Sequence, residues 1–129
     1  MIKSPPNFDN GIEIKLDCIS VRTNSNATIL NNIGFKIIKG ELVAILGQSG
    51  AGKTTLLRSM ACLLKPYKNR VLFNNYDFFS LKKKDKLLLR RKISFIPQQF
   101  KLIKELSVFE NVMIGRLGYM NPIYSKLSV

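Results

Sequence analysis

Apolar and polar side chains alternate in the N-terminal part of the chain. In residues 12–21, IEIKLDCISV, every second side chain as far as Cys18 is apolar, and this period of two predicts a half-buried β-strand. A polar turn, RTNSNA, separates it from a second strand-like run, TILNNIGFKIIKG, which ends at Gly40. Because a short polar turn joins the two runs, we predict an antiparallel pair of strands.

The next run, ELVAIL at residues 41–46, is apolar without alternation. This pattern predicts a strand covered on both faces, as in a parallel sheet. A glycine-rich stretch follows. Residues 53–65, KTTLLRSMACLLK, then place apolar side chains at helical spacing and stop before Pro66, which cannot continue a helix. The predicted order is therefore strand, glycine loop, helix.

Beyond Pro66 the same two periodicities continue. They predict a short strand at 70–75, a basic helix at 80–92, a buried strand at 93–97 and a helix at 107–117. Ser107 is expected to cap the last helix, with Glu110 three positions later completing a capping box. Alternation of strands and helices along the chain predicts an α/β fold.

The size and composition of the chain limit its organisation. With 129 residues we expect one domain, preceded by an extended arm at residues 1–10 because Pro5 and Pro6 favour extended backbone. A hydrophobic content of 46% and a charged content of 22% are typical of globular proteins. No apolar run is long enough to cross a bilayer, and MIKSPPNFDN lacks the apolar centre of a secretion signal. We therefore expect neither a transmembrane segment nor a signal peptide, and a location inside the cell.

The net charge of +13 permits nucleic acid, an anionic membrane surface or a phosphate ligand as partner. Its densest runs, KKKDK and RRK, bracket LLL, as on an exposed amphipathic helix with a solvated basic face. A dedicated site for a polyanion is the alternative. These runs carry no interleaved aromatic residues, which disfavours a nucleic-acid partner.

The chain contains two cysteines, Cys18 and Cys62. They have no metal-ligand spacing and no histidine to join them, so neither zinc binding nor thiol–histidine catalysis is supported. We expect both to be reduced thiols in the core.

The glycine-rich stretch GQSGAGKTT fits the pattern Gly-x-x-x-x-Gly-Lys-Ser/Thr, which is typical of phosphate-binding loops. Glycines let backbone N–H groups close around phosphate oxygens, and the following helix directs its positive end at them. Lys53 is expected to reach the β- and γ-phosphates, and the Thr54 hydroxyl to bind Mg²⁺. The alternative is a glycine turn that binds nothing. The predicted binding residues are Gly47, Gln48, Ser49, Gly50, Ala51, Gly52, Lys53, Thr54 and Thr55.

Together with ISFIPQQFKLIKELSVFENVMIGRLGYM, this loop and its flanks resemble the nucleotide-binding subunits of ABC transporters, most closely those of phosphonate importers. The resemblance implies an α/β fold: a partial P-loop NTPase core with an N-terminal antiparallel β-subdomain and the start of the ABC helical subdomain. It implies ATP and Mg²⁺ as cofactors. It also places Gln98 at the Q-loop position, a catalytic residue that contacts Mg²⁺ and the attacking water; an ordinary exposed loop residue is the alternative.

The resemblance further implies a peripheral ATPase subunit on the cytoplasmic face of the inner membrane, energising import of phosphonate or a related oxyanion. Its partners would be a membrane permease, a second nucleotide-binding subunit and, indirectly, a solute-binding protein. The family continues for about as many residues again as this chain holds, with the signature sequence, the catalytic glutamate and the switch histidine. Residues 1–129 are therefore expected to be the N-terminal portion of one nucleotide-binding domain, binding nucleotide without turnover.

Two other functions explain part of the sequence. A non-hydrolysing nucleotide-binding remnant or interaction module would need only the phosphate-binding loop. A small nucleotide or nucleoside kinase would also need an arginine-rich lid, for which LLLRRK is a poor candidate.

Overall fold

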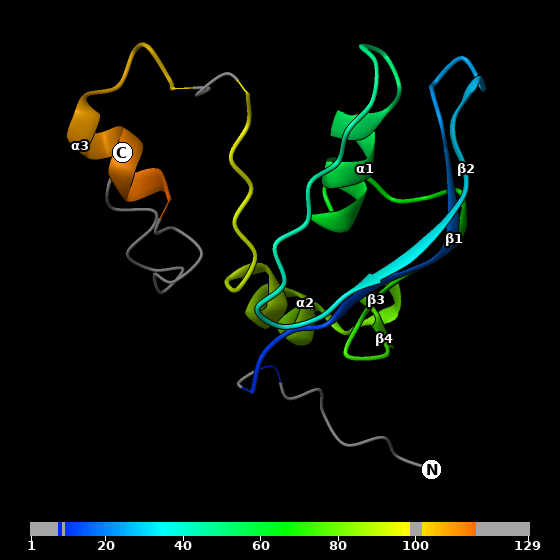
Figure 1. Ribbon diagram of the computed structural model, residues 1–129. Coiled ribbons are helices and arrows are strands. Elements are labelled where there is room, and N and C mark those ends of the chain that lie inside the picture. The colour runs from blue at the N-terminus through cyan, green and yellow to red at the C-terminus, as the bar shows by residue number, and fades with distance from the viewer. Residues whose placement is uncertain (1–7, 9, 99–101, 116–129) are drawn as a thin grey trace. The chain divides into compact units, whose positions relative to one another are not determined.

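The computed structural model describes residue 8 and residues 10–98 and 102–115 (Figure 1). These residues form two compact units, one ending at Leu89 and the other beginning at Arg90. Most of the predicted N-terminal arm lies outside the described residues. Within the described part of the chain, no helix is long and apolar enough to cross a membrane.

The first unit is built on a four-stranded sheet of order β2-β1-β3-β4, in which every neighbouring pair is antiparallel. The strands are β1 Ile14–Arg22, β2 Thr28–Ile37, β3 Lys68–Phe73 and β4 Tyr76–Asp77. The predicted antiparallel pair is therefore confirmed as β1 and β2. The short strand predicted at 70–75 is found as β3, with its bounds shifted, and the structure adds its antiparallel pairing with the other edge of β1.

A change of register in β1 sets which side chains enter the core. The ladder to β2 shifts between Leu16 and Ile19, and Cys18 between them has a φ of 48°. The shift moves the buried positions from Leu16 to Ile19 and Val21, all nearly inaccessible to solvent. Cys18 is exposed as a result, so the prediction of two core thiols is wrong for Cys18 and confirmed for the buried Cys62. A strictly alternating pattern could not reveal this bulge.

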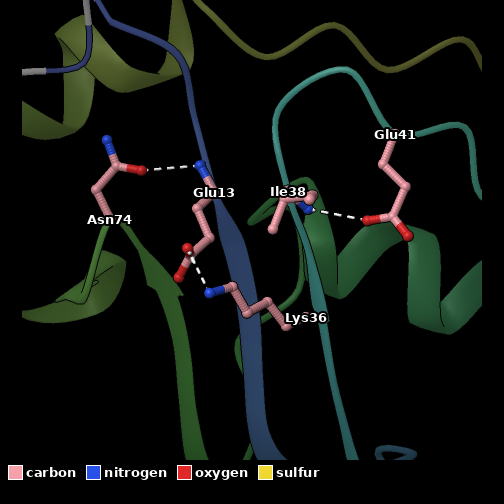
Figure 2. A network of polar contacts seen from close by, with 5 residues as sticks. All are labelled: Glu13, Lys36, Ile38, Glu41 and Asn74. Atoms are coloured by element: carbon pink, nitrogen blue, oxygen red, sulfur yellow. Dashed lines mark hydrogen bonds and ion pairs between the residues drawn. The ribbon is translucent and has the colours of Figure 1, made fainter.

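Polar contacts hold the end of the sheet from which the chain leaves β2 (Figure 2). Lys36 Nζ lies 2.7 Å from Glu13 Oε2, and the backbone N–H of Glu13 donates to Asn74 Oδ1 at 2.8 Å. The backbone N–H of Ile38 donates to Glu41 Oε2 at 3.0 Å. These contacts tie β1, β2 and the β3–β4 turn together and fix the start of segment 41–46.

Segment 41–46 is not a strand in the structure, contrary to the prediction. Leu42 is 98% exposed and Leu46 is 91% exposed. A strand needs neighbours to satisfy its backbone N–H and C=O groups. Among the described residues, the sheet ends at β2 and β4 and no strand pairs with this segment.

Helix α1, Lys53–Met60, packs beside β1 and β2 (Figure 1). It begins where predicted but ends five residues before Lys65. At its end Cys62 has a φ of 55°, while the N–H groups of Cys62 and Leu63 donate to the carbonyls of Ser59 and Arg58. This is a Schellman motif, which closes a helix and is usually formed with glycine at the left-handed position. A cysteine at this position gives no signal in the sequence that a helix ends here.

The β3–β4 hairpin leads into a 3₁₀ turn, Phe78–Ser80, and then helix α2, Lys83–Arg90. Asp77 caps the turn by accepting the N–H of Phe79 at 3.1 Å. Phe73 and Phe78 pack against one another in the core. The predicted basic helix is therefore confirmed, with narrower bounds.

In the second unit, helix α3 spans Val108–Ile114. Ser107 Oγ accepts the N–H of Glu110, and the Glu110 carboxylate accepts the N–H of Ser107, so the predicted capping box is confirmed. The predicted buried strand at 93–97 is wrong, because this segment is irregular and Ile96 is 85% exposed. The last two residues of the predicted helix, 116 and 117, lie outside the described residues.

Candidate phosphate-binding loop

The loop that joins segment 41–46 to α1 turns sharply at its glycines. The N–H of Ala51 donates to the carbonyl of Gln48 at 3.3 Å, closing a turn. Gly50 and Gly52 have φ angles of 81° and 87°, in the left-handed region where side chains are strained. Gly50 and Gly52 are therefore required by the backbone path itself.

Gly52 also meets a packing requirement. A Cβ atom at this position would lie 2.9 Å from Cδ2 of Leu30 and 3.2 Å from Cγ2 of Ile29. Only a glycine lets the first residue before α1 approach β2 this closely. Leu30 and Ile29 are thus supporting residues of the loop that the motif did not reveal, although their place in a strand preceding the loop was predicted.

The N-terminus of α1 suits an anion. Its N-cap residue, Gly52, offers no side-chain hydrogen bond, and the first turn contains no acidic residue. The first N–H groups of a helix have no intrahelical partners, and the helix dipole places partial positive charge beside them. Backbone donors without a side-chain cap are therefore available for a ligand such as phosphate.

Lys53 lies across this loop. Its Nζ donates to the carbonyl of Gly47 at 2.7 Å and to that of Gln48 at 2.6 Å. Both acceptors are neutral, whereas a phosphate oxygen is an anionic acceptor and forms a stronger charge-assisted bond. The side chain thus keeps a positive charge at the start of the loop, where it can exchange its carbonyl partners for phosphate.

The remaining loop residues are placed as follows. Gln48, Ser49, Ala51 and Thr54 are exposed, and Thr55 is half-buried. Thr54 lies in the first turn of α1, and its hydroxyl is the oxygen type that Mg²⁺ prefers. The residues present therefore fit a phosphate group and offer one oxygen ligand to its metal ion.

Gln98 is exposed and belongs to the second unit. Its catalytic and metal-binding role stays a prediction that rests on the resemblance.

The chain is similar in sequence to known proteins. The ABC transporter family model matches residues 30–128. A phosphonates import ATP-binding protein, PhnC 2, of Synechococcus sp. is 35% identical over 108 residues, which are 84% of this chain and 40% of that protein. PhnC of Alcaligenes faecalis is 41% identical over 90 residues, covering 70% of this chain and 33% of the relative. The chain thus spans less than half the length of these curated relatives.

A solved structure is similar over most of the chain. It is the dimeric post-hydrolysis state of the ATP-binding cassette MJ0796 bound to ADP and Pi, with 32% identity and a TM-score of 0.68, over 88% of this chain and 53% of that one. This similarity supports the predicted fold class, a partial α/β P-loop NTPase fold with an antiparallel β-subdomain.

Proposed function

This chain belongs to the ABC transporter family, and from that premise we propose that residues 47–55 bind the phosphates of Mg-ATP. The observation that carries the proposal is the position of Lys53, whose ammonium bridges the carbonyls of Gly47 and Gln48 beside the uncapped start of α1. A cation, backbone donors and left-handed glycines converge there, as phosphate binding requires.

Each residue type has a distinct task in this proposal. Lys53 moves from its carbonyl partners to phosphate oxygens, and the N–H groups at the start of α1 hold the same phosphates. Thr54 contributes its hydroxyl to Mg²⁺, and Gln98 contributes its side-chain oxygen. When bound, Mg²⁺ neutralises negative charge on the phosphates.

We infer that the complete protein is the ATP-hydrolysing subunit of an importer for phosphonate or a related oxyanion. The names of the PhnC relatives support the substrate, and the dimeric cassette supports pairing with a second nucleotide-binding subunit. The other proposed partners are a membrane permease and, indirectly, a solute-binding protein. Such a subunit lies on the cytoplasmic face of the cell membrane.

The test of this proposal is ATP binding by the 129-residue chain, measured by calorimetry with Mg²⁺ present. Lys53→Ala removes the charged donor and is expected to weaken binding by about tenfold to a hundredfold. Arg58→Ala is the matched control, because it removes one cation from the last turn of the same helix. Equal affinity of wild type and Lys53→Ala would overturn the assignment of the loop.

Hydrolysis separates the two candidate functions. The phosphate-binding loop supplies positioning, whereas turnover also needs an oriented water and neutralisation of developing charge. We expect this chain to bind ATP and release no phosphate alone, and to gain turnover when combined with the C-terminal half of a PhnC relative. Binding without turnover in that mixture would favour the non-hydrolysing module.

A further inference from the structure

Helix α2, Lys83–Arg90, has one face fixed against the rest of the first unit. Leu89 is fully buried, and Lys86 Nζ donates to the carbonyl of Phe79 at 2.8 Å. Asp85, on the same side of the helix, is half-buried. These contacts determine which side chains α2 presents to solvent.

The outward face of α2 combines lysines with leucines. Lys83 and Leu87 are four positions apart, as are Lys84 and Leu88, so each pair shares one face of the helix. Both lysines are exposed, and the leucines are 45% and 42% exposed. Lys82 is also exposed, immediately before the helix, and adds a third positive charge next to Lys83. We call these five residues the α2 face.

The α2 face is strongly positive. Seven of the 21 lysines and arginines of the chain lie between Lys82 and Lys92, where Asp85 is the only acid. Since Asp85 lies on the inward side, it does not interrupt the face. Among the described residues, none of Lys82, Lys83 and Lys84 forms an ion pair. Their charge is therefore available to an external anionic partner.

The leucines decide which anionic partner fits. A nucleic acid would be bound by basic residues with aromatic or polar side chains between them. Exposed leucines beside lysines suit an anionic bilayer instead, because the leucines can enter the acyl region while the long lysine stems let the ammonium groups reach the phosphates. We propose that the α2 face docks directly on a membrane surface rich in anionic phospholipid.

This interaction goes beyond the proposed nucleotide site and requires no nucleotide. It is tested by sedimenting the full 129-residue chain with vesicles of phosphatidylcholine mixed with phosphatidylserine, and with vesicles of phosphatidylcholine alone. Wild type is expected to sediment with the anionic vesicles only. Replacing Lys82, Lys83 and Lys84 by glutamine is expected to weaken this binding about a hundredfold, since each lysine near an anionic surface contributes about fivefold.

A charge-matched variant tests whether vesicle binding depends on the position of the positive charges and not only on their number. Lys15→Gln, Lys68→Gln and Arg70→Gln together remove three exposed positive charges from β1 and β3. This control is expected to lose less than about tenfold, because those residues lie outside the α2 face. Equal loss in both triple variants would overturn the proposal in favour of binding by net charge.

The leucines need a separate test. At high salt the lysine contribution is screened, so the vesicle binding that remains is expected to depend on the leucines. Leu87→Ser with Leu88→Ser is expected to abolish this remaining binding. Leu57→Ser with Leu63→Ser, at two similarly exposed leucines in and just after α1, is expected to retain it. The proposal is wrong if wild type ignores anionic vesicles. It is also wrong if a single-stranded RNA competes the chain off the vesicles while the leucine variant binds them unchanged.

Discussion

A Cβ atom at Gly52 would lie 2.9 Å from Cδ2 of Leu30. Leu30 is buried on β2, so it cannot move aside without disturbing the core. Gly52 is also left-handed, with a φ of 87°, and is the residue from which α1 starts. One glycine therefore serves the turn of the phosphate-binding loop and the packing of the helix that follows it.

Gly52→Ala is expected to destabilise the first unit by about 3 kcal/mol, from backbone strain and overpacking together. Gly50→Ala is the matched control. Its φ of 81° is nearly the same, but an added Cβ would meet no atom within 4 Å, so only the strain of about 1 kcal/mol remains. Urea unfolding followed by circular dichroism measures both. Equal losses would show that the approach of α1 to β2 does not depend on Gly52.

The sequence predicts those parts of the fold whose signals are local. Alternation predicts β1, the strand-like run after a polar turn predicts β2, and the Ser107–Glu110 spacing predicts the capping box of α3. The position of Lys53 at the start of α1 follows from the loop motif. In each case a few consecutive residues carry both the pattern and the interaction that it predicts.

The predictions that the structure contradicts concern features that depend on residues distant in the sequence, or on backbone conformations that are unusual for their residue types. Segments 41–46 and 93–97 have the composition of buried strands, but a strand forms only beside another strand, and the described residues provide none there. The bulge at Cys18 and the left-handed Cys62 have no composition signal, because glycine or asparagine is the usual residue for such backbone. The role of Leu30 beneath Gly52 appears only when strand and loop are packed.

The β3–β4 turn offers a stabilising substitution. Asn74 and Asn75 have φ angles of 47° and 66°, as a type I′ turn requires, and asparagine followed by glycine is preferred there. Asn75→Gly is therefore expected to stabilise the chain by about 0.5 kcal/mol.

Asn74→Gly provides the contrast. Asn74 accepts the N–H of Glu13 and donates to the carbonyl of Gly11 at 3.1 Å, so its loss is expected to destabilise by about 1 to 2 kcal/mol. Urea midpoints of the two variants must shift in opposite directions. A shift in the same direction would contradict this assignment of the turn.

Helix α3 is expected to respond to pH through Glu110. Hydrogen bonds from the Ser107 hydroxyl, and then from the Ser107 backbone N–H, hold the pKa of Glu110 below its ordinary value near 4.5. A lowered pKa in the folded state means that the carboxylate stabilises α3 above about pH 4.5, and that this contribution is lost as the pH falls through the lowered pKa.

Carbon chemical shifts of α3, measured by NMR across this acidic range, are expected to move toward coil values as Glu110 is protonated. Glu110→Gln should remove the pH response, whereas Glu105→Gln, just outside the cap, should leave it in place. Loss of helix in the Glu110→Gln variant with the same pH profile as wild type would assign the response to another group.

Thr54 tests the metal part of the proposed function. Its exposed hydroxyl in the first turn of α1 is the only loop side chain to which we assign a Mg²⁺ contact, with Gln98 as the second proposed ligand in the other unit. Thr54→Val keeps the shape and removes the oxygen. In wild type, ATP affinity is expected to differ between measurements with and without Mg²⁺. In Thr54→Val the two affinities are expected to become nearly equal, since a lost charged hydrogen-bond or metal contact is worth about 2 kcal/mol.

Thr28→Val is the control for Thr54→Val. It lies on the exposed side of β2 and should keep the wild-type Mg²⁺ dependence. If Thr54→Val also keeps the Mg²⁺ dependence of ATP affinity, the metal is bound without this hydroxyl. Phosphate binding by Lys53 is tested separately, with the Lys53→Ala variant.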